Sequence, residues 1–218
     1  MIVSAARPPE GAQEGQGQGP RGAPASAPHR AVFLDRDGVI VVDHGYVHRV
    51  EDFRFVPGSA QALLRLQAAG WRPVVVTNQS GLARGLYSAD DYERFTAHLR
   101  EQLRAVGVRL DAVLHCPHLP DAAVASYRLA CDCRKPAPGM LLRAARELAI
   151  DLAGSVIVGD RLSDVQAGRA AGVGHCVLVR SGHPLDPSEL RQADAVYDNL
   201  EQFTQAWLAA DAPWRRLR

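Results

Sequence analysis

The sequence has almost no lysine, no long apolar run and almost no net charge, and each shortage excludes a class of protein. Only one of its 25 basic residues is a lysine. No stretch approaches the ~20 apolar residues of a membrane-spanning helix, and residues 1–6 lack the apolar core of a secretory signal. A net charge of +1 gives no general attraction to nucleic acid or to anionic membranes. We therefore expect a cytoplasmic protein without a nucleic-acid or membrane partner.

The single lysine is Lys135, in a chain that otherwise uses arginine for positive charge. An ammonium is a compact, strongly hydrated point charge, and a guanidinium is a planar fork that cannot replace it everywhere. Lys135 is therefore a candidate functional residue. The alternative is that one lysine has survived by chance in an arginine-rich chain.

The chain divides into a tail and one α/β domain. Residues 1–28 are rich in Gly, Pro, Gln and Ala, and we predict an extension that is disordered because this composition cannot bury a core. Beyond it, β-branched apolar runs alternate with amphipathic stretches, whose expected N-caps are Ser59, Ser88 and Ser163. This alternation predicts a three-layer, doubly wound, mainly parallel sheet. The domain is expected over residues 29–208, followed by a C-terminal tail, 209–218.

The predicted first strand, residues 31–34, runs directly into Asp35-Arg36-Asp37-Gly38. Extended backbone would direct Asp35 and Asp37 to one side and Arg36 to the other. Two close carboxylates repel each other unless a cation lies between them. Since Mg²⁺ prefers a few carboxylates together with phosphate oxygens, this stretch predicts a magnesium site. The plainer alternative is a strand that ends in a polar turn.

Polar residues also lie beyond the other predicted strands: Thr77 with Asn78, Asp160 with Asp164, and, just after a loop, Arg134 with Lys135. The carboxyl ends of parallel strands meet at one edge of the sheet, where ligands bind. Acids for a metal, a hydroxyl donor and an ammonium are the groups that phosphoryl transfer requires, and a carboxylate can be its nucleophile. We expect the ammonium of Lys135 to lie between Asp35 and Asp160. Taken singly, each group could instead belong to a turn or a helix N-terminus.

A second cluster has the pattern Cys116-Pro-His118, twelve residues, then Cys131-Asp-Cys133. Three thiols and one imidazole match the ligands of a closed structural Zn²⁺ site, whereas disulfides are rare in the cytoplasm. The alternative is a set of ordinary buried thiols. Because Arg134 and Lys135 follow the last ligand directly, a bound zinc would also fix their position.

The motifs together resemble the haloacid dehalogenase (HAD) superfamily over about residues 30–200. The segments that carry the resemblance are Asp35-Arg-Asp-Gly, Thr77-Asn-Gln-Ser-Gly-Leu-Ala-Arg-Gly85, Cys116-Pro-His, Cys131-Asp-Cys-Arg-Lys-Pro-Ala-Pro-Gly-Met140 and Val158-Gly-Asp-Arg-Leu-Ser-Asp164. The resemblance implies a HAD-like sheet with a minimal cap formed by a zinc loop. It also implies a Mg²⁺- and Zn²⁺-containing phosphatase that acts as a monomer through an aspartyl-phosphate.

Roles for individual residues follow only from this resemblance. Asp35 would be the nucleophile, Asp37 the acid and then the base, and Thr77 and Lys135 would stabilise the transferring phosphoryl group. Magnesium would be held at Asp35, at the main-chain carbonyl of Asp37, at Asp160 and near Arg161. The substrate would be lined by Asp43, His44, Gly45, Tyr46, Asn78, Gln79, Ser80 and Arg134.

The resemblance implies that the substrate is a small sugar bisphosphate. The segments that favour this substrate are His-Gly-Tyr-Val at 44–47 and residues 78–85. Histidinol-phosphate phosphatases share the acidic motifs and a Cys-Pro-His-Leu-Pro segment like that at 116–120, so they are the main alternative. Other small sugar phosphates are a further possibility. A zinc-stabilised binding module without activity would predict the loss of a catalytic group, and none of the implied groups is missing.

Overall fold

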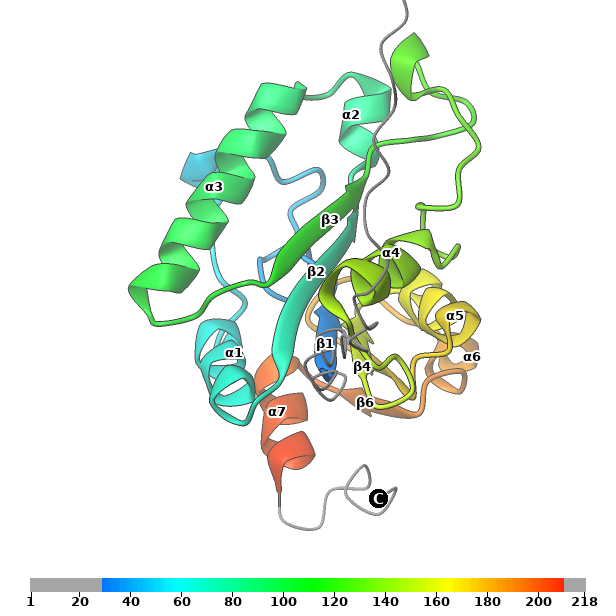
Figure 1. Ribbon diagram of the computed structural model, residues 1–218. Helices are drawn as coiled ribbons and strands as arrows, with labels where there is room; N and C mark the ends of the chain where they lie inside the picture. The colour runs from blue at the N-terminus through cyan, green and yellow to red at the C-terminus, as the bar shows by residue number, and fades with distance from the viewer. Residues whose placement is uncertain (1–28, 210–218) are drawn as a thin grey trace, which may run out of the picture.

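Six parallel strands form the centre of the computed structural model, which describes residues 29–209 (Figure 1). Their order is β3-β2-β1-β4-β5-β6. The strands are β1 (Ala31–Leu34), β2 (Arg72–Asn78), β3 (Ala112–Cys116), β4 (Val156–Gly159), β5 (His175–Val179) and β6 (Ala195–Tyr197). The predicted doubly wound parallel sheet is confirmed. The expected extension 1–28 and nearly all of the expected tail lie outside the described residues.

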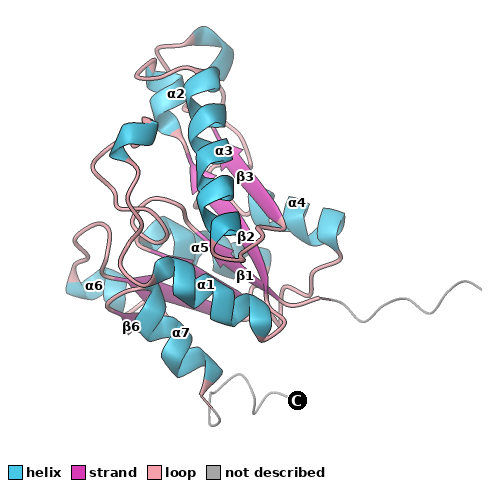
Figure 2. Ribbon diagram, turned by 90° about the vertical axis from the view of Figure 1, so that its left-hand side faces the viewer, coloured by secondary structure: helices cyan, strands magenta, loops and turns pink. Residues whose placement is uncertain are grey.

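Helices connect the strands and cover both faces of the sheet (Figure 2). The α-helices are α1 (Ser59–Ala68), α2 (Ser80–Arg84), α3 (Ala89–Ala105), α4 (Gly139–Leu148), α5 (Leu162–Ala171), α6 (Pro187–Leu190) and α7 (Leu200–Leu208), and the 3₁₀ turns are η1 (Val50–Asp52) and η2 (Ala125–Tyr127). Within residues 29–209, no helix has both the length and the apolar character needed to cross a bilayer.

The helix caps are predicted correctly at one of three positions. Ser88 caps α3 and forms a capping box with Asp91, as its sequence pattern indicates. Ser59 is wrong as a cap, because Gly58 holds that position in a left-handed conformation and the Ser59 hydroxyl donates to the carbonyl of Ile40. Ser163 is wrong as well, since Arg161 is the N-cap of α5.

The core consists of two apolar layers, one on each face of the sheet. Val32 and Leu34 of β1 belong to the layer packed under α1, α3 and α7. Ala31 and Phe33, the alternate residues, belong to the layer under α4 and α5. All four side chains are fully buried. A strand covered on both faces has no polar side, which explains why β1 is an uninterrupted apolar run.

The position of β1 determines where a ligand can bind. Chain order moves from β1 to β2 and β3 on one side, and from β4 to β5 and β6 on the other. The two halves therefore meet between β1 and β4, which pair in register from Val32–Val156 to Leu34–Val158. Loops diverge in opposite directions beyond this point and leave a crevice at the carboxyl ends of the two strands.

Candidate active site

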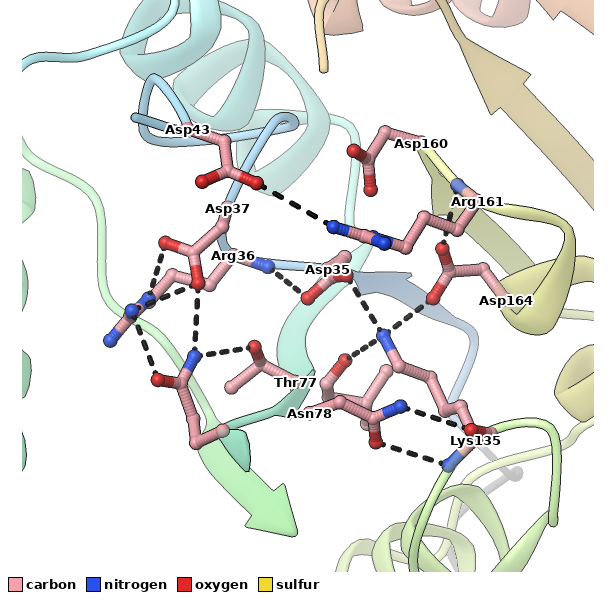
Figure 3. Close-up of polar contacts among 12 residues, drawn as sticks. Asp35, Arg36, Asp37, Asp43, Thr77, Asn78, Lys135, Asp160, Arg161 and Asp164 are labelled. Atoms are coloured by element: carbon pink, nitrogen blue, oxygen red, sulfur yellow. Dashed lines mark hydrogen bonds and ion pairs between the residues drawn. The ribbon is translucent and has the colours of Figure 1, made fainter. Parts of the chain in front are cut away.

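A cavity of about 820 Å³ opens at this crevice. The first residues beyond β1 and β4, Asp35 and Asp160, both lie there (Figure 3). Its lining residues come from five segments of the chain, which include the end of β2, α2 and the start of α5: Asp35, Asp37, Asp43, Gly45, Tyr46, Thr77, Asn78, Gln79, Ser80, Arg84, Tyr87, Arg134, Lys135, Pro136, Arg161, Ser163, Gly182, His183 and Pro184. Sequence segments that are far apart thus form one polar pocket, as the strand-end pattern predicts.

Lys135 is buried and lies between two carboxylates. Its Nζ is 3.1 Å from Oδ2 of Asp35 and 2.5 Å from Oδ1 of Asp164, and it donates to the carbonyl of Val76. Burial by itself would lower the pKa of Lys135, but the carboxylates of Asp164 and Asp35 outweigh it and raise that pKa. The ammonium therefore stays charged. The expectation that Asp160 would be its second partner is wrong, because Asp164 takes that place.

Asp160 lies fully buried with one oxygen engaged and the other available. Its Oδ2 accepts a hydrogen bond from the main-chain N–H of His183 at 3.0 Å, and the His183 ring nitrogen Nδ1 lies 3.1 Å away. Its Oδ1 is buried and has no hydrogen-bond partner within residues 29–209. Burial, with the Asp35 carboxylate as a second cause, raises the pKa of Asp160.

Glycines make room for this carboxylate. A Cβ on Gly38, which has φ +78°, would lie 2.5 Å from Oδ2 of Asp160, and a Cβ on Gly182 would lie 2.1 Å from the same atom. Only glycine allows the backbone of both loops to approach so closely. Carboxylate oxygens of Asp35, Asp160 and Asp164 lie within 4.8 Å of one another. Together with the unpaired Oδ1 of Asp160, this group fits a small hard cation such as Mg²⁺.

Asp37 is held by Arg36, contrary to the expectation that these side chains point apart. The strand ends at Leu34, so the alternation of extended backbone does not continue through Asp37. Arg36 donates from Nε and Nη2 to the two oxygens of Asp37, each at 2.9 Å, and from Nη2 to the carbonyl of Val47 at 2.7 Å. Burial raises the pKa of Asp37, although Arg36 acts in the opposite direction. A raised pKa favours a carboxyl group that can donate a proton.

The expected substrate residues are distributed unevenly. Six of them line the cavity and are partly or fully exposed, so a ligand can reach them: Asp43, Gly45, Tyr46, Asn78, Ser80 and Arg134. His44 is exposed and does not line the cavity. Gln79 borders the cavity but is buried, with its amide bound to protein groups. The Asn78 side chain also donates to the main-chain carbonyl of Lys135 and accepts from its N–H, which ties β2 to the loop that carries Lys135.

Arg161 does not offer its side chain as a metal ligand, because a guanidinium has no acceptor atom. The group lies 3.8 Å from Oδ2 of Asp43 and contacts the His183 ring. The sequence did not predict a role for His183, nor the ion pair between Asp164 and Lys135. Their signals were present: His183 follows the end of β5 by a few residues, and Asp164 stands in the first turn of α5.

The four expected zinc ligands converge. The Sγ of Cys116 is 3.5 Å from that of Cys131, and the Sγ of Cys133 is 3.2 Å from Cys131 and 3.4 Å from Nδ1 of His118. A tetrahedral zinc with Zn–S bonds of about 2.3 Å would need sulfurs about 3.7 Å apart, so the cluster is close to that size. Cys176 is buried in the core from β5, and the half-buried His115 ring packs against Tyr92 with centroids 4.1 Å apart, so neither joins the four ligands, as expected.

Comparison with known proteins agrees with this geometry. The HAD-hydrolase-like family matches residues 132–203. The D-glycero-β-D-manno-heptose-1,7-bisphosphate 7-phosphatase of Escherichia coli K12 is 48% identical over 81% of this chain and 92% of its own length, and that of Photorhabdus laumondii is 46% identical over 81% and 94%. The crystal structure of a D,D-heptose 1,7-bisphosphate phosphatase from B. bronchiseptica with magnesium and phosphate has 37% identity and a TM-score of 0.71, covering 82% of this chain and 98% of that one.

The fold and the pocket define a HAD-like hydrolase of the phosphatase class, as the sequence motifs indicate. Within that class, the identity and coverage of the relatives place the chain in one family. It belongs to the D-glycero-β-D-manno-heptose-1,7-bisphosphate 7-phosphatase family.

Proposed function

We propose that this protein hydrolyses the 7-phosphate of D-glycero-β-D-manno-heptose 1,7-bisphosphate in a magnesium-dependent reaction. The observation that carries the proposal is the buried triad in which Lys135 joins Asp35 to Asp164 beneath an open polar cavity. The names of the relatives supply the substrate, and the long coverage of both chains supports its transfer.

Asp35 is the nucleophile in this proposal. One of its oxygens attacks the phosphorus, and the bond from phosphorus to the sugar oxygen breaks to leave an aspartyl-phosphate. Asp37 gives its proton to the departing sugar oxygen, so that an alcohol leaves rather than an alkoxide. Lys135 balances the charge of Asp35 and of the phosphoryl oxygens, and the Thr77 hydroxyl is a second donor at this edge.

Water then completes the reaction. Asp37, now a carboxylate, takes a proton from water as the water oxygen attacks the phosphorus. The bond to Asp35 breaks, inorganic phosphate forms and both carboxyl groups return to their starting states. Arg36 binds both oxygens of Asp37, which would hold the acid and the base in one position.

Two metals fit the residues that are present. Asp35, the carbonyl of Asp37 and the free oxygen of Asp160 would hold Mg²⁺, which supplies charge neutralisation for the phosphate oxygens. Cys116, His118, Cys131 and Cys133 would hold Zn²⁺ as a structural ion. On the substrate side, Asp43, Gly45, Tyr46, Asn78, Ser80 and Arg134 would contact the sugar bisphosphate.

The first prediction tests the nucleophile. Asp35→Asn should lower kcat at least about 10³-fold, because the remaining groups cannot replace a missing nucleophile. Phosphate release is measured from heptose bisphosphate, fructose bisphosphate and histidinol phosphate, with ³¹P NMR to identify the bond cleaved. Near-normal turnover by Asp35→Asn would reject the mechanism, and a preference for histidinol phosphate would reject the substrate.

We also propose that the protein works as a monomer in the cytoplasm. A cluster of three thiolates needs a reducing compartment, because thiols only about 3–4 Å apart oxidise readily outside it. Cell fractionation and light scattering of the purified chain test the compartment and the monomer separately.

A further inference from the structure

Gln79 and Tyr87 form a buried connection that ends on the proposed acid. The Nε2 of Gln79 donates to Oδ2 of Asp37 at 3.0 Å and to Oγ1 of Thr77 at 2.9 Å. The hydroxyl of Tyr87 donates to Oε1 of Gln79 at 2.6 Å. Both side chains border the cavity but are buried, Gln79 at 3% and Tyr87 at 7% exposure, and their polar atoms already bind protein groups.

The hydrogen-bond partners of Oε1 fix the orientation of the Gln79 side-chain amide. Oε1 accepts from Tyr87 and, at 3.2 Å, from Nη2 of Arg36. An amide turned by half a rotation would present its NH₂ group to these two donors, which is unfavourable. The NH₂ group must therefore face Asp37. Burial raises the pKa of Tyr87 well above its ordinary value, so its hydroxyl remains a donor.

The local packing is built around the Tyr87 ring. A Cβ on Gly81 would lie 2.0 Å from the Cε1 atom of Tyr87, so only glycine at 81 leaves room for this ring. The His48 ring also stacks on Tyr87, with centroids 4.7 Å apart and planes 16° apart. The stacked His48 ring covers one face of Tyr87, and hydrogen bonds between buried groups are stronger than in water.

We propose that Tyr87, through Gln79, is a positioning residue that holds Asp37 in the place from which it protonates the leaving sugar oxygen. This inference rests on the proposed function, in which Asp37 is the general acid. It also changes the role of Gln79 from a substrate contact to a support for the acid and for Thr77.

The effect of displacing Asp37 on kcat/KM should depend on the leaving group of the substrate. An alkoxide leaves only when it is protonated, whereas p-nitrophenolate leaves without a proton. Losing the correct position of Asp37 should therefore lower kcat/KM for a sugar phosphate and change it little for p-nitrophenyl phosphate. Since kcat/KM reports on the steps up to the first irreversible one, later hydrolysis of the aspartyl-phosphate does not obscure the comparison.

The experiment compares Tyr87→Phe, Gln79→Leu and Asp37→Asn with the wild-type protein on heptose bisphosphate and on p-nitrophenyl phosphate. A general acid contributes about 10²–10⁴-fold, which is the limit for Asp37→Asn on the sugar substrate. We expect a loss of roughly 10-fold for Tyr87→Phe, equal to about 1.4 kcal/mol, and a larger one for Gln79→Leu. On p-nitrophenyl phosphate Tyr87→Phe should stay within about 2-fold of wild type, whereas Gln79→Leu, which also removes the hydrogen bond to Thr77, should lose some kcat/KM but less than on the sugar phosphate.

Tyr92→Phe is the matched control, because Tyr92 belongs to the same small apolar cluster but its ring packs against His115. It should not distinguish the two substrates. Suppose Asp37→Asn lowers kcat/KM only for the sugar phosphate. If Tyr87→Phe and Gln79→Leu then lower kcat/KM equally for both substrates, or for neither, the positioning role is overturned and the proposed function stands. If Asp37→Asn is itself not selective, the acid assignment fails first.

Discussion

Lys135 shows how one side chain serves several groups at once. Its ammonium contacts two carboxylates and a main-chain carbonyl, so its three N–H donors all have partners. It is 3% exposed, and removing it would leave Asp35 and Asp164 buried and mutually repelling. A chain that uses arginine at its other basic positions has kept lysine here because three acceptors surround a single point.

The prediction at this scale concerns the shape of the cation. Lys135→Arg should lose roughly 10²-fold or more in kcat, nearly as much as Lys135→Ala, because a planar fork cannot occupy the space between the two carboxylates and Val76. Steady-state kinetics and melting curves measure both variants. Arg143→Lys, at an exposed position of α4 that pairs with Glu147, is a control for a change of basic side chain away from the site. Retention of most activity by Lys135→Arg would mean that only charge matters at this position.

The loop between β3 and α4 is the element that presents Lys135. Residues 117–138 contain only the short turn η2 as regular structure, and loops of this length without support are uncommon in compact domains. Cys131 and Cys133 are half-buried, and they precede Lys135 by a few residues. A metal that joins them to Cys116 at the end of β3 would fix the loop to the sheet.

We predict one tightly bound zinc per chain. Cys131→Ser should lower the zinc content severalfold, lower the melting temperature and reduce kcat, because the position of Lys135 depends on the loop. Elemental analysis of protein purified without added metal measures the zinc. Cys176→Ala is the matched control: this thiol lies in β5, and the variant should keep its zinc. Full activity with little or no zinc would contradict a structural ion.

At the scale of the whole molecule, stability and chemistry are located at opposite edges of the sheet. The site occupies the carboxyl ends of the strands. At the other edge, the Trp207 ring of α7 packs against Trp71, just before β2, with centroids 5.6 Å apart, and against His175, the first residue of β5, at 5.2 Å. Trp207 is 4% exposed, so α7 closes one apolar layer there.

Trp207→Ala should therefore separate the two properties. Truncating a large buried aromatic ring costs about 3–5 kcal/mol of unfolding free energy, which corresponds to a fall in melting temperature of roughly 6–20 °C for a chain of this size. Below that temperature kcat should be close to wild type. Denaturant titration and kinetics at 25 °C test both statements, with the exposed Leu64→Ala of α1 as a control of small effect. A large loss of kcat in a folded variant would show that α7 influences the site.

The sequence by itself determined the features that depend on the chain locally. Continuous β-branched apolar runs predicted the strands within a few residues. Polar residues near strand ends predicted which edge carries the site, because parallel strands share one carboxyl edge. The spacing of Cys116, His118, Cys131 and Cys133 predicted a cluster because few arrangements of thiols and imidazole serve another purpose.

The tertiary structure alone decided which of these side chains contact one another. Arg36 and Asp37 pair because the strand ends before them, and Lys135 pairs with Asp164 rather than Asp160 because the first turn of α5 brings Asp164 over the ammonium. His183 reaches Asp160 from the loop after β5. Such contacts depend on strand order, on where each loop turns and on side-chain rotamers. These are set by packing between distant segments, so no local pattern encodes them.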